Sequence, residues 1–170
     1  MSKLGGMKCT QLSSTDAKEV LRTLFDDEVL NHGSYNVVFA HDHAHGSELA
    51  GYLIGYRFAP LELMALPFAL SLDPEHMDMA TPVTRGATVG ADLTNLVDIA
   101  DLGSSYRLQL STERTLLFEV SEHTLISWAC AGPEERVLVE LEQSTDAADF
   151  HAFMHQVFDR FDEFDQGHQS

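Results

Sequence analysis

The feature that most constrains the fold is a series of four segments, between residues 106 and 142, in which apolar and polar residues alternate. The segments are 106–111, 115–120, 126–130 and 137–142. Successive side chains of a strand point to opposite faces, so this alternation is typical of a sheet with one buried face. The links between the segments are a few residues long, and such links join antiparallel neighbours. These residues therefore predict an antiparallel meander.

The last helix is expected to begin at Ser144 or Thr145 and to carry a large apolar stripe. The stripe consists of Phe150, Phe153, Val157, Phe161 and Phe164, which recur at helical spacing. A stripe of this kind has to be buried, and either the sheet or a second subunit could cover it.

The first half of the chain predicts a helix, three strands and a second, shorter helix. The first helix begins near Ser13-Ser14-Thr15-Asp16, with Asp16 and Glu19 spaced as a capping box, and stops at Asn31-His32-Gly33. The strands are 35–40, 49–58 and 61–72, although the last is rich in Leu, Met and Ala and could be helical. Residues 73–90 form a long excursion, and Leu93, Leu96, Val97 and Ala100 predict a short helix that ends at Gly103.

The order of these elements predicts an α+β fold. We expect a mainly antiparallel sheet of about seven strands, with an N-terminal helix, a short middle helix and a C-terminal helix packed on it. A chain of 170 residues with 44% hydrophobic content suits one domain. We expect a flexible tail over residues 1–12 and a single domain over residues 13–165.

Charge narrows the classes of partner. The chain has 10 lysines and arginines against 27 acidic residues, for a net charge of -17. Such a surface repels phosphate, which argues against nucleic acid and anionic membranes as partners. Solubility or adaptation to salt explains the acidity more readily than a basic partner or bound cations. Cys9 and Cys130 give no disulfide framework, and no signal peptide or membrane span is recognised, so a cytoplasmic protein is expected.

Residues 41–45 read His-Asp-His-Ala-His and are the first candidate for metal chemistry. If the preceding strand continues, the side chains of His41 and His43 lie on one face, roughly 6.6 Å apart at the backbone, and both can hold one ion. His45 would lie about 13 Å from His41, too far to share it. Glu48 is the nearest further ligand. The alternative, which short polar residues before Gly46 favour, is an exposed loop with solvated histidines.

The spacing His41-x-His43-x4-Glu48-x6-Gly55 resembles the first metal-binding motif of the cupin family. The resemblance covers some fifteen residues and implies a metal held by the two histidines and the glutamate inside a β-barrel. The family's companion motif, Pro-x-Gly followed by a fourth ligand histidine, has no counterpart downstream. The predicted helices also differ from a barrel, so the family's activity is not carried over.

His151 and His155 form a second candidate pair, because residues four apart lie on one face of a helix. The residues between them lack the glutamate of an HExxH metalloprotease, and a solvated polar face is the favoured alternative. The two histidine clusters could share a single ion if this helix docks across the strand that carries His41 and His43.

Two hypotheses on function follow. The favoured one is a small acidic, non-enzymatic module that binds a protein partner or itself, for instance as a homodimer, with no cofactor. Small acidic partner proteins such as secretion chaperones are similar in composition and general fold. The other is a metal-dependent enzyme or metal carrier that uses His41, His43 and Glu48, with or without His151 and His155, and binds zinc, nickel or manganese.

Overall fold

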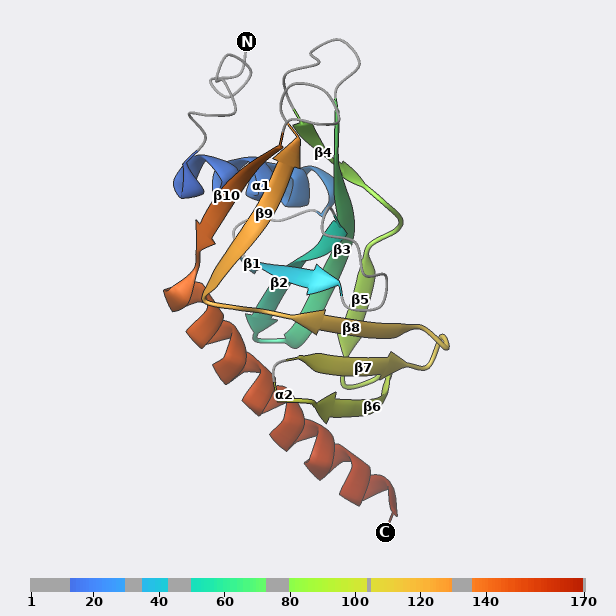
Figure 1. Ribbon diagram of the computed structural model, residues 1–170. Helices are drawn as coiled ribbons and strands as arrows, with labels where there is room; N and C mark the ends of the chain where they lie inside the picture. Colours follow the sequence, from blue (N-terminus) through green and yellow to red (C-terminus); the bar gives the residue numbers. More distant parts are fainter. Residues whose placement is uncertain are drawn as a thin grey trace.

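The computed structural model describes residues 13–29, 35–42, 50–72, 80–103, 105–129 and 136–169. This part of the chain contains two helices and ten strands (Figure 1). In chain order they are α1 (Ser14–Glu28), β1 (Asn36–Asp42), β2 (Ala50–Phe58), β3 (Leu61–Leu72), β4 (Ala80–Thr84), β5 (Val89–Asp92), β6 (Leu96–Asp101), β7 (Tyr106–Leu110), β8 (Thr115–Glu119), β9 (His123–Ala129), β10 (Arg136–Glu142) and α2 (Ser144–Gln169).

The strands form one large sheet and one hairpin, and every pairing is antiparallel. The large sheet has the order β4-β3-β2-β1-β8-β7-β6, and β5 also pairs with β3. β9 and β10 pair only with each other among the described strands. The predicted α+β class and antiparallel pairing are therefore confirmed. The predicted meander over residues 106–142 is not continuous, because β8 pairs with β7 and β1 and, among the described strands, not with β9.

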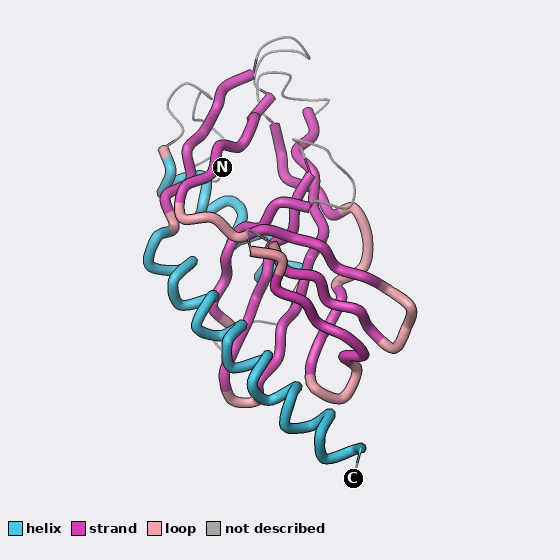
Figure 2. Tube along the Cα trace, turned by 60° about the horizontal axis from the view of Figure 1, so that its bottom comes forward, coloured by secondary structure: helices cyan, strands magenta, loops and turns pink. Residues whose placement is uncertain are grey.

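The centre of the sheet, β1 to β3, is buried on both faces. Ala40, Tyr52 and Ile54 belong to the core on the side of α2. Phe39 and Leu53 belong to a second core with α1 and the end of β10. Figure 2 shows the long helix α2 running along one side of the strands. Burial on both faces explains why residues 49–72 are almost continuously apolar, and why β3 was ambiguous in the sequence although it is a strand.

The apolar stripe of α2 covers the sheet of its own chain. The side chains of Phe150 and Phe153 are fully buried, with ring centroids 5.2 Å and 5.1 Å from that of Tyr56. Burial decreases toward the C-terminal end of the helix, where Phe164 is 42% exposed. In Figure 1 the last turns of α2 extend beyond the sheet. The first half of the stripe is therefore core and is not available to a second subunit.

The predicted middle helix is wrong, because residues 96–101 form strand β6. β6 pairs with β7, and the register shifts between Leu96 and Asp98. This bulge inserts one extra residue, so that Leu96 and Ile99, three positions apart, both pack against the core. A spacing of three is typical of a helix, and here a bulged strand produces it. The predicted excursion over residues 73–90 likewise contains β4 and the start of β5.

The capping box of α1 lies three residues earlier than predicted. Ser13 is the N-cap, and its hydroxyl oxygen accepts a hydrogen bond from the N–H of Asp16 at 3.2 Å. The Asp16 carboxylate accepts one from the N–H of Ser13 at 3.3 Å. Two otherwise unpaired N–H groups are satisfied in this way, which fixes where the helix begins.

Candidate functional site

The sheet has a gap beside its central strand. β1 and β8 pair at only two positions, His41 with Glu119 and Asp42 with Phe118. Beyond Glu119 the chain turns away toward β9, whereas the N-terminal part of β1 continues past this point along β2. The first five residues of β1 are thus paired with β2 on one side and have no strand on the other among the described residues.

The side chain of Gln143 fills the part of this gap that lies next to β8. Its amide oxygen accepts a hydrogen bond from the N–H of Phe39 at 3.1 Å, and its amide nitrogen donates to the carbonyl oxygen of Phe39 at 3.0 Å. The same nitrogen donates to the carbonyl oxygen of Ser121 at 2.9 Å. Gln143 is only 5% exposed, and both its amide oxygen and its amide nitrogen have hydrogen-bond partners. The side chain therefore takes the place of a peptide group in a neighbouring strand.

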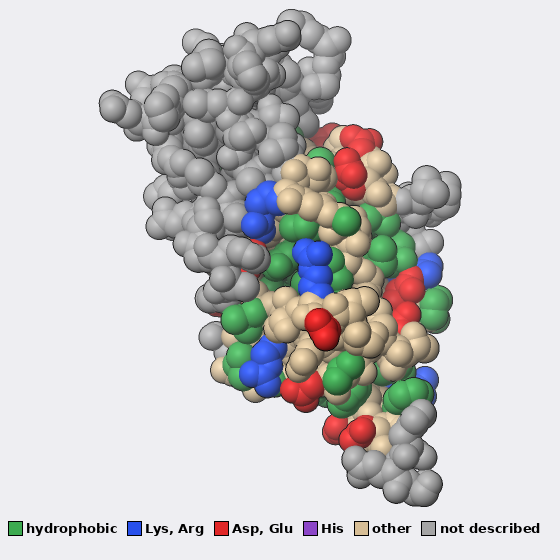
Figure 3. Space-filling view, turned by 90° about the vertical axis from the view of Figure 1, so that its right-hand side faces the viewer, with side chains coloured by type: hydrophobic (Ala, Val, Ile, Leu, Met, Phe, Trp, Pro, Cys, Tyr) green, Lys and Arg blue, Asp and Glu red, His purple; other side chains and the backbone are tan. Residues whose placement is uncertain are grey.

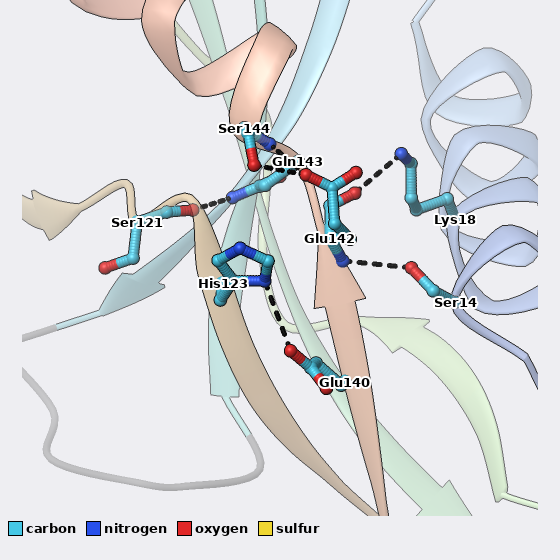
Figure 4. Close-up of polar contacts among 8 residues, drawn as sticks. All are labelled: Ser14, Lys18, Ser121, His123, Glu140, Glu142, Gln143 and Ser144. Carbon is cyan, nitrogen blue, oxygen red and sulfur yellow. Dashed lines mark hydrogen bonds and ion pairs between the residues drawn. The ribbon is translucent and has the colours of Figure 1, made fainter.

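Contacts between the two ends of the chain hold Gln143 in position (Figure 4). The N–H of Glu142 donates to the hydroxyl oxygen of Ser14 at 2.9 Å, and the ammonium of Lys18 donates to the carbonyl oxygen of Glu142 at 2.8 Å. The Glu142 carboxylate accepts hydrogen bonds from the hydroxyl and the N–H of Ser144, the latter at 2.9 Å. The hydroxyl bond, and then the N–H bond, lowers the pKa of Glu142. The junction of β10 and α2 is thereby fixed against α1.

The next position along the same edge of β1, at Val37, has no partner in the described part of the chain. Peptide groups two residues apart in a strand face the same side, so those of Val37, Phe39 and His41 all face the gap. His41 lies opposite Glu119 and Phe39 is bonded to Gln143. No described residue bonds the N–H or the carbonyl oxygen of Val37 on this side. The edge therefore has two positions filled by the chain itself and a third that no residue of the described ranges fills.

A hollow with a cavity volume of about 80 Å³, partly open to solvent, lies at this third position. Its walls come from α1, β1, β2, the end of β10 and the start of α2. They consist of Lys18, Leu21, Arg22, Val37, Val38, Phe39, Leu53, Leu141, Gln143 and Asp146. Most of these side chains are apolar, and a few polar groups stand among them. This composition is typical of a binding site.

The hollow has two cationic side chains, both from α1, in a chain that is strongly acidic overall. Lys18 is bonded to the Glu142 carbonyl, as described above. Arg22 is exposed and forms no ion pair with any described residue. Asp146, in the first turn of α2, is the one acidic side chain that the described residues contribute to the wall. The α1 side of the hollow is therefore positive and the α2 side negative.

A buried ion pair ties the other end of β1 to the sheet. The side chain of Asp42 is fully buried, and its carboxylate accepts from the guanidinium of Arg85 at 2.9 Å. Arg85 also donates to the carbonyl oxygen of Phe68 at 2.8 Å. Burial raises the pKa of the neighbouring Tyr52, and the negative charge of Asp42 adds to this effect. These contacts join the C-terminal end of β1 to β3. Figure 3, which looks onto the right-hand side of Figure 1, shows lysine and arginine side chains set among hydrophobic ones with acidic side chains around them.

The structure describes one of the three predicted ligands in the His41, His43 and Glu48 set. β1 continues through His41, whose ring packs against Phe39 with centroids 5.0 Å apart and hydrogen-bonds the hydroxyl of Thr124. His43 and Glu48 lie outside the described residues. A metal site of these three residues remains a prediction.

The second predicted pair is separate from His41. Nδ1 of His151 lies 2.6 Å from the Tyr106 hydroxyl, and its ring also packs against Phe150, so it is not on a solvated face. Burial, with a contribution from the charge of Asp101, raises the pKa of Tyr106 to about 12. His155 is exposed. His41 packs on the α1 side of the sheet and His151 on the α2 side, so these two do not share an ion. No group of three metal-ligating side chains occurs in the described part of the chain.

Sequence reasoning missed the residues that form the gap. Gln143 stands between a strand and a helix start, where a polar residue is ordinary. Val37 is one of several apolar residues in a strand, and its open edge depends on the order of the strands. The signals that could have pointed to the site are Lys18 and Arg22, four residues apart on a helix and thus on one face.

No protein-family model, no curated protein and no solved structure matches this chain. No helix of the described residues is long and apolar enough to cross a membrane.

Proposed function

We propose that this protein is a small acidic, non-enzymatic binding module that takes up an extended segment of a partner protein beside β1. The observation that carries the proposal is the peptide group of Val37, which has no hydrogen-bond partner on its gap side among the described residues and faces a mostly apolar hollow. Extended peptides commonly bind by adding to the edge of a sheet, where main-chain hydrogen bonds give affinity and side-chain pockets give specificity. Gln143 already binds the neighbouring peptide group of Phe39 in this manner.

The outer edge at β6 is less suited to such pairing. β6 carries Asp98 and Asp101 and a bulge, and these features discourage the addition of another strand. The edge of β1 at Val37 has no acidic side chain of its own strand beside it, and apolar side chains surround it. The gap therefore offers both an open strand edge and a hollow for a side chain. The edge of β6 does not offer this combination.

Selection from a library of random linear 12-residue peptides displayed on phage tests the proposal. We expect enriched peptides that bind the purified protein in calorimetry. The amide resonances of Val37 and Phe39 should shift on binding, and the amide of Val37 should gain protection from hydrogen exchange. The variant Val37→Pro removes the N–H that faces the gap and should weaken binding at least tenfold. A proline is tolerated where the N–H is not part of a ladder, so the fold should persist.

Val97→Pro is the matched control, because Val97 is the extra residue of the β6 bulge and is 56% exposed. It should bind the selected peptides like the unchanged protein. Failure to enrich any peptide, or peptides whose resonance shifts map away from the gap, would overturn the proposal. The protection of the Val37 amide in the unchanged protein decides the matter even if Val37→Pro fails to fold.

A further inference from the structure

We infer that the gap selects a partner segment with alternating chemistry: an apolar residue and an acidic residue, two positions apart, face α1, and the residues between them are uncharged or basic. This inference rests on the proposed function, because it concerns the segment that would occupy the gap. The two faces of an added strand would lie against different walls of the hollow, and the chemistry of these walls sets the preference.

The residue opposite Val37 would point its side chain toward α1. Directly paired residues of two strands share a face, and Val37 shares its face with Phe39. On that face the hollow is lined by Leu21 and Leu141, both almost completely buried. An apolar side chain at this position would complete the core between α1 and β10.

The next residue on the same face lies two positions along the segment, roughly 7 Å away. Lys18 and Arg22 lie on the same side, one turn apart on α1. A carboxylate there can approach Arg22, which has no ion-pair partner among the described residues. An aspartate or glutamate two residues from the apolar one is therefore favoured.

The residues that alternate with these would face the start of α2, where the charge is negative. The Tyr56 hydroxyl donates to the Asp149 carboxylate at 2.7 Å, and Asp146 lines the hollow. Burial, and then its hydrogen bond to Asp149, raises the pKa of Tyr56, so the hydroxyl stays neutral and adds no charge of its own beside these acids. A carboxylate on this face of the segment would be repelled, whereas a basic or uncharged side chain would not.

Parallel selections of the same 12-residue library on the unchanged protein and on Arg22→Glu test the inference. Peptides selected on the unchanged protein should be several-fold enriched in acidic residues two positions from an apolar residue. Selection on Arg22→Glu should lose this enrichment. A synthetic peptide from the first pool should bind Arg22→Glu about tenfold more weakly, and the difference should shrink at high salt because exposed charges are screened.

Arg160→Glu is the matched control, since it makes the same change in net charge on an exposed part of α2. It should select the same peptides as the unchanged protein. Identical charge patterns in the unchanged and Arg22→Glu pools would overturn the inference and leave the proposed function standing. Equal effects of Arg22→Glu and Arg160→Glu would assign the preference to net charge and also overturn it. Absence of enriched peptides in every pool would instead refute the proposed function.

Discussion

Replacement of Gln143 by methionine measures how strongly the amide holds the gap together. Methionine has a similar length and volume but no polar head, so the change removes the three hydrogen bonds to Phe39 and Ser121 and leaves packing largely intact. A hydrogen bond contributes about 1 kcal/mol net, and a buried group left without a partner costs about 1–3 kcal/mol. We therefore expect Gln143→Met to lower the free energy of unfolding by about 3 kcal/mol.

Urea unfolding followed by circular dichroism gives this difference, provided that the slope with denaturant is unchanged. The control is Gln109→Met, which replaces an exposed glutamine of β7 and should alter stability by less than about 0.5 kcal/mol. Hydrogen exchange at the Phe39 amide should become faster in Gln143→Met only. A loss below about 1 kcal/mol, with unchanged exchange at Phe39, would refute the reasoning, since it would mean that water in the hollow replaces the amide at little cost.

Three further perturbations test the packing and the electrostatics. A Cβ at Gly55 would overlap a phenylalanine ring of α1, so Gly55→Ala should destabilise by about 1–3 kcal/mol in thermal or urea unfolding; Gly86→Ala, whose Cβ would meet its nearest atom at 3.8 Å, should be tolerated. Tyr106 keeps its proton to about pH 12, whereas an unfolded tyrosine loses it near pH 10. The free energy of unfolding should therefore decrease as the pH rises from 10 to 12. In Tyr106→Phe this decrease should be smaller, and an equal decrease in both proteins, measured by urea unfolding, would contradict the reasoning. Arg85→Ala should cost about 3 kcal/mol because it removes the partner of the buried Asp42 carboxylate, and the double variant with Asp42→Asn should lose less than the two single changes together.

The sequence predicts those elements whose residues carry their own periodicity. The alternation in β7 and β8 reflects one buried face and is confirmed. The stripe of α2 is confirmed as core at Phe150 and Phe153, whereas Phe164 at its end is 42% exposed. β6 was mistaken for a helix because a bulge places its two buried residues three positions apart, and a bulge has no separate signature in the residue pattern.

The candidate site could not be predicted because it arises from pairing over long distances in the sequence. Val37 has the same residue type whether its edge is paired or open, and only the departure of β8 at Glu119 leaves it open. Gln143 contacts Phe39 across 104 positions, which no local pattern encodes. The histidine motif, by contrast, is conspicuous in the sequence, and the one imidazole of it that the structure describes is engaged with Thr124.

The contacts between α1 and the end of β10 have a consequence for the order in which the chain folds. They join residues 128 and 124 positions apart, so two facing walls of the hollow, α1 and the end of β10, come from distant parts of the sequence. Contacts of such separation form late, because the long intervening chain has to be ordered before they can close. A chain whose synthesis has not yet reached β10, or one cut before β10, contains α1 and β1. It lacks the wall of the hollow that the end of β10 and the start of α2 form. A partner that binds in this gap therefore distinguishes completely folded copies from unfinished ones, and its binding energy adds to the stability of the last contacts to form.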